Sequence, residues 1–78
     1  MPTALDELRK RLAEPPLPKE LAIAQVSNAL LELGYELRVT GSHYQFRKPG
    51  AKRLTMAVHK KRVGAAAVRD LAELLRQQ

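Results

Sequence analysis

The sequence contains no cysteine. Disulfide bonds are therefore excluded, and so is a zinc site built from thiolates. No apolar run approaches the roughly 18 residues that a transmembrane helix needs, and the N-terminus lacks the pattern of a secretory signal peptide. These absences predict a soluble, cytoplasmic protein. A chain of 78 residues has the length of one small domain with a modest hydrophobic core.

Several catalytic motifs are also missing. No aspartate occurs between Asp6 and Asp70, so Ser42 lacks a Ser-His-Asp constellation that would make it a nucleophile. The sequence has no Gly-rich phosphate loop. Its two histidines have only Glu36 as an acidic neighbour, which leaves a metal site without a third plausible ligand. We therefore expect no metal and no other cofactor.

Positive charge is concentrated in the middle of the chain. Residues 35–62 have a net charge of +7 because Glu36 is their only acid, whereas the segments on either side are close to neutral. Such a region is typical of proteins that bind a polyanion such as RNA, while a purely solubilising surface is usually mixed in sign. The candidate RNA-binding residues are Arg38, Gln45, Arg47, Lys48, Lys52, Arg53, Lys60, Lys61 and Arg62.

Apolar residues at helical spacing predict three helices. The first covers residues 3–14, with Thr3 as its N-terminal cap, and a proline-rich connection follows it up to residue 18. This helix could dock on the domain, bind a partner or fray. The second covers residues 19–33, where Leu21, Ala22 and Ala29 widen its apolar face, and the third runs from Gly64 to the C-terminus.

Between the last two helices the apolar period changes to two, which predicts three antiparallel strands at residues 35–40, 43–47 and 53–59. Gly41-Ser42 joins the first two strands, residues 48–52 form a hairpin loop, and Lys60-Lys61-Arg62 form a basic connection. Helices on one face of an antiparallel sheet give a two-layer α+β domain. Strand parity directs these residues toward the helices: Tyr35, Leu37, Val39, Tyr44, Phe46, Leu54, Met56 and Val58.

The same parity places His43 and His59 on the polar, cationic face of the sheet. If Gln45 pairs with Thr55, then His43 faces Ala57 and His59 lies one diagonal step away, with Cβ atoms roughly 7–8 Å apart or less. Two imidazoles at that distance could flank one phosphodiester. RNA carries its own nucleophile, the ribose 2′-OH, so one base and one acid suffice for cleavage without a metal. The alternative is that His43, near a tight turn, only hydrogen-bonds the backbone.

The runs Leu33-Gly34-Tyr35, Thr40-Gly41-Ser42-His43-Tyr44 and Ala57-Val58-His59, in this order, resemble the HicA (YcfA-like) toxin family over about residues 21–75. The resemblance implies a double-stranded-RNA-binding-domain-like fold, with a three-stranded sheet and two helices on one of its faces. It further implies a domain over residues 19–78, preceded by the N-terminal helix and connection of residues 1–18.

In function, the resemblance implies a toxin that cleaves messenger RNA and arrests translation, with a HicB-type antitoxin covering its active face. The family's functional histidine corresponds to His43, and His59 is a second candidate. We therefore expect a metal-independent endoribonuclease. Two alternatives remain at this stage: a non-catalytic RNA-binding module of the same fold, and a protein-interaction domain that binds an acidic antitoxin.

Overall fold

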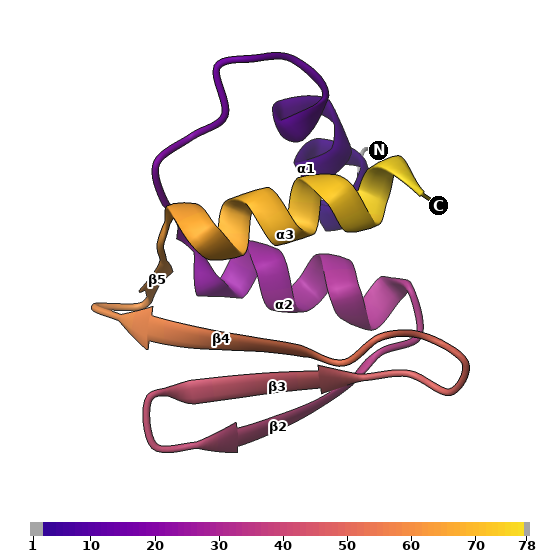
Figure 1. Cartoon of the computed structure of the whole chain (residues 1–78), viewed down its shortest axis with the longest axis vertical. Coiled ribbons are helices and arrows are strands. Elements are labelled where there is room, and N and C mark those ends of the chain that lie inside the picture. Colours follow the sequence, from indigo (N-terminus) through magenta and orange to yellow (C-terminus); the bar gives the residue numbers. More distant parts are fainter. Residues whose placement is uncertain (1–2, 78) are drawn as a thin grey trace.

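The computed structural model describes residues 3–77, and it is an α+β fold (Figure 1). Its arrangement is consistent with the double-stranded-RNA-binding-domain-like fold that the sequence predicted. No helix in the described part of the chain is long and apolar enough to cross a membrane. The elements in chain order are α1 (Ala4–Ala13), β1 (Leu21–Ala22), α2 (Ile23–Glu32), β2 (Glu36–Thr40), β3 (His43–Arg47), β4 (Leu54–His59), β5 (Arg62–Val63) and α3 (Ala65–Arg76).

Within residues 3–77 the sheet has five strands, in the order β1-β5-β4-β3-β2, and all neighbours are antiparallel. The prediction of three strands was therefore wrong in number. The two additional strands are each two residues long, and so short a segment shows no alternation of apolar and polar residues. Within the hairpin, the predicted register is confirmed: Gln45 pairs with Thr55 and His43 pairs with Ala57.

The start of the second helix also differs from the prediction. Helix α2 begins at Ile23, while Leu21 and Ala22 form β1 and pair with Val63 and Arg62. Leu21 is buried and Ala22 is exposed, as expected of successive residues in a strand. The backbone N–H of Ile23 donates to the carbonyl oxygen of Lys61 at 2.9 Å, which ties the helix start to the β4–β5 turn. A partner that distant in sequence leaves no local signal.

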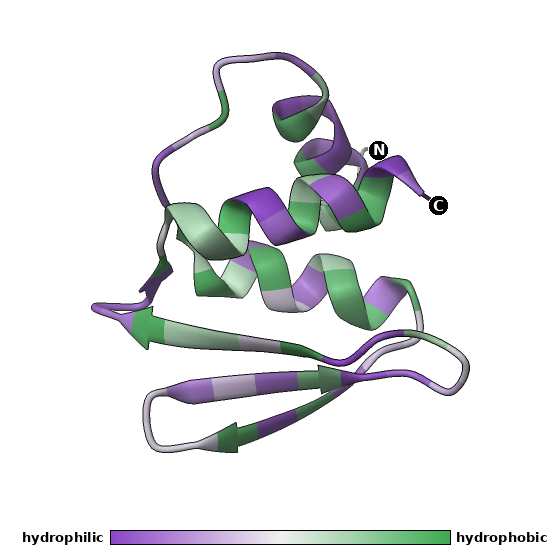
Figure 2. Ribbon diagram, in the orientation of Figure 1, coloured by the Kyte–Doolittle hydropathy of each residue, from purple (hydrophilic) through white to green (hydrophobic). Residues whose placement is uncertain are grey.

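The core lies between the sheet and the two helices α2 and α3, which cover one face of it (Figures 1 and 2). Leu30, Phe46 and Val68 are fully buried there. The inward parity that the sequence predicted is confirmed for most strand positions, and Phe46 belongs to the core rather than to a base-stacking surface. Val39 differs, because it is 51% exposed on the edge strand β2. An edge strand has only one neighbour, so its ends are covered less well.

Helix α1 docks on the domain. Figure 1 shows it on the side of α2 and α3 that is remote from strands β2–β4. Leu8 and Leu12 are buried in the common core, and the backbone N–H of Leu5 donates to a side-chain oxygen of Glu32 at 2.8 Å. Thr3 forms the predicted cap, since it accepts from the backbone N–H of Asp6 while the Asp6 side chain accepts from Thr3.

Candidate nucleic-acid interface

The sheet face that points away from the helices carries part of the candidate site, and we call it the outer face. Strand pairing arranges its residues in rows. One row holds Thr40, His43 and Ala57, and the next holds Arg38, Gln45 and Thr55. Glu36 and Arg47 form a third row. Every member of these rows except Gln45 is exposed, and Gln45 is half-buried. The sheet therefore brings four of the predicted site residues onto one surface: Arg38, His43, Gln45 and Arg47.

His43 is held at the start of β3 by a two-residue turn. Gly41 has φ +60°, a conformation that glycine adopts without steric cost, and glycine at the first central position is typical of a type II′ hairpin turn. The carbonyl oxygen of Ser42 accepts from the backbone N–H of Val58 at 2.7 Å. This bond fixes the turn against β4, so the position of His43 is set by backbone hydrogen bonds on both sides.

Both imidazoles are accessible. His43 and His59 are exposed, and within residues 3–77 neither ring takes part in a hydrogen bond or an ion pair. His43 is therefore not engaged by the backbone, contrary to the alternative considered for a histidine beside a turn. Its direct neighbours, Thr40 and Ala57, are small and leave space on both flanks of the ring. His59 lies two residues beyond Ala57, past the last β3–β4 pair, and pairs with Arg62 of β5.

The turn between β4 and β5 adds two cations next to His59. Lys60 and Lys61 connect His59 to its strand partner Arg62, with φ values of 51° and 63°. Two positive φ angles are typical of a type I′ turn, in which asparagine and glycine are usual. The turn therefore places two exposed lysines directly after His59.

The other cations lie away from the histidines or have partners within the protein. Lys52 and Arg53 are exposed in the loop before β4, at the opposite end of the sheet from the histidines. Two predicted residues have partners within the protein: the Lys48 amine lies 5.6 Å from the centre of the Tyr35 ring, and Arg62 forms an ion pair with Glu20. The sequence analysis predicted neither contact. Tyr35 and Lys48, like Glu20 and Arg62, are far apart in the sequence, and only the fold brings them together.

The described residues contain no group of three or more His, Asp or Glu side chains that could hold a metal ion. What the outer face offers is proton exchange and positive charge. Histidine exchanges protons readily near neutral pH, and the surrounding lysines and arginines are suited to phosphate oxygens.

Comparison with known families identifies the domain. The family model for the HicA toxin of bacterial toxin–antitoxin systems matches residues 23–77. The chain belongs to the HicA toxin family. The match begins at the first residue of α2 and includes the whole of the outer face from Glu36 to Arg62, whereas α1 lies outside it. Neither curated proteins nor solved structures gave a match. As a HicA domain, the chain is the toxin of a toxin–antitoxin system, whose members pair with an antitoxin.

Proposed function

We propose that this HicA toxin is a metal-independent endoribonuclease that cleaves messenger RNA on the outer face of its sheet. The observation that carries the proposal is the placement of His43: the ring is exposed, free of hydrogen bonds within the described residues, and paired with Ala57, two residues before a second exposed histidine. The family match supports the same conclusion, since HicA toxins are generally ribonucleases.

In the proposed reaction, His43 removes the proton from a ribose 2′-OH. The 2′-oxygen attacks the adjacent phosphorus, a bond from the 2′-oxygen to phosphorus forms, and the bond from phosphorus to the 5′-oxygen breaks. His59, in its protonated form, gives a proton to the leaving 5′-oxygen. The products are a 2′,3′-cyclic phosphate and a 5′-hydroxyl, and no oxidant, reductant or metal is consumed. Positioned proton transfer of this kind contributes about 10²–10⁴-fold to a rate.

Cations on the outer face and in the β4–β5 turn hold the RNA backbone. Arg38 lies in the row next to His43, and Lys60 and Lys61 follow His59 directly. Positive groups at these positions would stabilise the negative charge that develops on the phosphorus-bound oxygens in the transition state. A HicB-type antitoxin would inhibit the toxin by covering the same surface.

The test is cleavage of a labelled messenger RNA by the wild-type protein and by His43→Ala, each with and without a chelator. We expect the substitution to reduce the cleavage rate by at least about 100-fold, the chelator to have no effect, and the wild-type products to carry 2′,3′-cyclic phosphate ends. Thr40→Ala, a change in the residue beside His43, is the matched control and should retain most activity. The HicB-type antitoxin at equimolar concentration should stop the wild-type reaction.

Each alternative has its own signature in this experiment. Equal rates for wild type and His43→Ala would show that the reaction does not depend on His43. Salt-dependent RNA binding by both proteins without any products would identify a non-catalytic binding module. Antitoxin binding without RNA binding would identify a protein-interaction domain.

A further inference from the structure

A groove lies at the end of the sheet opposite His43. It is formed where β2 begins, β3 ends and the loop before β4 turns, and its volume is about 510 Å³. Small-ligand sites have volumes of about 300–1,000 Å³. The residues that line it are Glu36, Arg47, Lys48, Pro49, Ala51 and Arg53.

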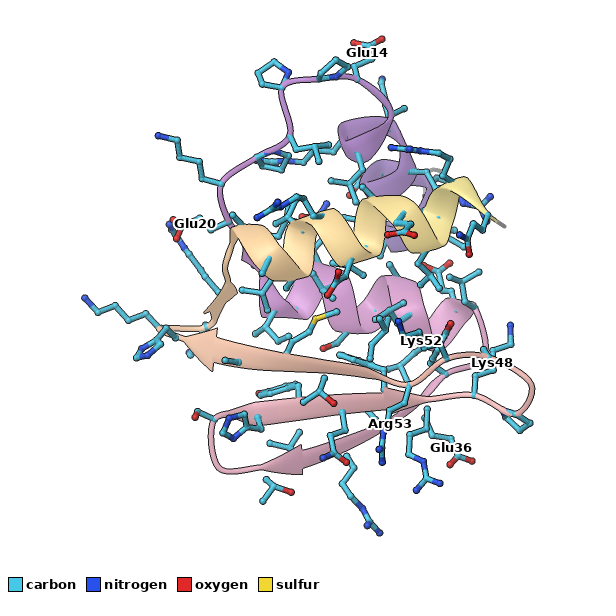
Figure 3. The ribbon with its side chains drawn as sticks, viewed as in Figure 1. Glu14, Glu20, Glu36, Lys48, Lys52 and Arg53 are labelled. Atoms are coloured by element: carbon cyan, nitrogen blue, oxygen red, sulfur yellow. The ribbon has the colours of Figure 1, made fainter. Side chains whose placement is uncertain are left out.

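Glu36 is unusual in this position. It is the only acid among residues 35–62, and it is directly opposite Arg47 in the β2–β3 pairing. Even so, the ion pairs of the described residues do not include Glu36, and no hydrogen bond to its carboxylate is present among them. Figure 3 shows Glu36 and Arg53 at the same end of the sheet, with both side chains pointing away from the helices. Both oxygens of the carboxylate are therefore available to a ligand.

A groove that only held phosphate would have no use for a carboxylate, because like charges repel. The combination of one carboxylate with two guanidinium groups instead matches a nucleobase. An unstacked base in single-stranded RNA can be read on its Watson–Crick and Hoogsteen edges, while an arginine plane or an apolar side chain covers its face. One arginine can form two hydrogen bonds to guanine, one to the O6 acceptor and one to the N7 acceptor. Guanine is also the base whose Watson–Crick edge presents two parallel N–H donors, from N1 and N2, to a carboxylate.

We propose that this groove binds one unstacked guanine of the RNA, with Glu36 accepting from its N1 and N2 hydrogens. Arg47 and Arg53 bond its acceptors or the adjacent phosphate, and Pro49 contacts its face. The inference rests on the proposed function, because it requires RNA on the outer face. Strand β3 separates Arg47 from His43 by four residues, or about 14 Å.

The experiment measures binding without cleavage. The full chain carrying His43→Ala is titrated into labelled uridine 12-mers that contain a single central guanine, adenine or cytosine, and fluorescence anisotropy reports the affinity. A gel confirms that the RNA stays intact. We expect the guanine oligonucleotide to bind about tenfold more tightly than the other two. In the double variant that carries both His43→Ala and Glu36→Gln, the preference for guanine should fall to less than about threefold. The reason is that a side-chain amide has one acceptor oxygen, whereas a carboxylate has two.

Glu14→Gln is the matched control, since it removes the same charge from an exposed position after α1, remote from the groove (Figure 3). It should leave the tenfold preference unchanged. Equal affinity for all three oligonucleotides would overturn the proposal, as would a guanine preference that survives Glu36→Gln. Because the assay needs no cleavage, its outcome is separate from that of the proposed nuclease activity. If the wild-type protein cleaves RNA but the binding assay shows no base preference, only the guanine-binding proposal is wrong. If the binding assay shows a guanine preference but the wild-type protein cleaves no RNA, only the proposed nuclease activity is wrong.

Discussion

At the scale of single residues, Lys60 and Lys61 have the backbone conformation that is least expected of them. Residues other than glycine and asparagine rarely adopt positive φ, and the left-handed conformation costs roughly 1–2 kcal/mol per residue. In this protein two consecutive lysines adopt it, in the turn that joins His59 to Arg62. Such strain is found where the side chain itself is needed, which agrees with the proposed role of both lysines in holding RNA.

Lys61→Gly should therefore make the protein more stable. Removing the side chain relieves the strain at φ 63°, and we expect the free energy of unfolding to rise by about 1 kcal/mol in a denaturant titration. The same variant should bind RNA more weakly, because it loses a cation. Lys52→Gly is the control, since Lys52 is not among the positive-φ residues, and it should give no gain in stability. A Lys61→Gly protein that is less stable than wild type would contradict this interpretation.

The sequence could predict the position of a residue where that position depends on a local pattern, such as the alternation of apolar and polar residues in a strand. Alternation along β3 and β4 was sufficient to place His43 opposite Ala57 and to separate it from Phe46 in the core. The positive φ of the lysines was not predictable, because nothing in Lys-Lys favours it. The exposure of Val39 was not predictable either, since it depends on which strand lies at the edge of the sheet.

At the scale of elements, α1 is a structural part of the domain although it lies outside the family match. Its capping box and its contacts with α2 and α3 give it a defined position. The sequence could predict the helix but not its docking, because two or three leucines on one face suit a partner protein as well as the domain itself. In the same way, the sequence contains Leu21 and Val63 but no sign that they pair as β1 and β5.

Leu8→Ala tests the contribution of α1. Leu8 is fully buried, and removing a buried leucine side chain costs about 2–5 kcal/mol of stability, depending on how well the cavity closes. The matched control is Leu31→Ala, because Leu31 is 48% exposed on α2 and should lose less than about 1 kcal/mol. Urea unfolding followed by circular dichroism measures both. Equal, small losses for the two variants would show that α1 contributes little to the fold.

At the scale of the whole molecule, the protein has two chemically different sides. Helix α1 and the outer face lie on opposite sides of the α2–α3 layer (Figure 1), and residues 35–62, with a net charge of +7, carry all of the excess positive charge of the chain. Long-range attraction for RNA should therefore be directed to the outer face, where the proposed reaction occurs.

This asymmetry predicts a steep dependence of RNA binding on salt. If about five cations contact phosphates, the logarithm of the binding constant should fall with a slope of about −3.5 against the logarithm of the salt concentration. Doubling the salt would then weaken binding about tenfold. Arg38→Ala should make the slope shallower by about 0.7, whereas Arg69→Ala, a change on α3, should leave it unaltered. Identical slopes for the two variants would mean that the outer face is not the RNA-binding surface.

The strict alternation of β3 has a consequence for how such toxins diversify. His43 and Gln45 belong to the outer face, while Tyr44 and Phe46 pack toward the helices. A substitution at one position therefore changes the RNA-facing surface, and a substitution at the next changes the core. Selection can therefore act on the RNA-facing surface and on the core through different positions of a single five-residue strand.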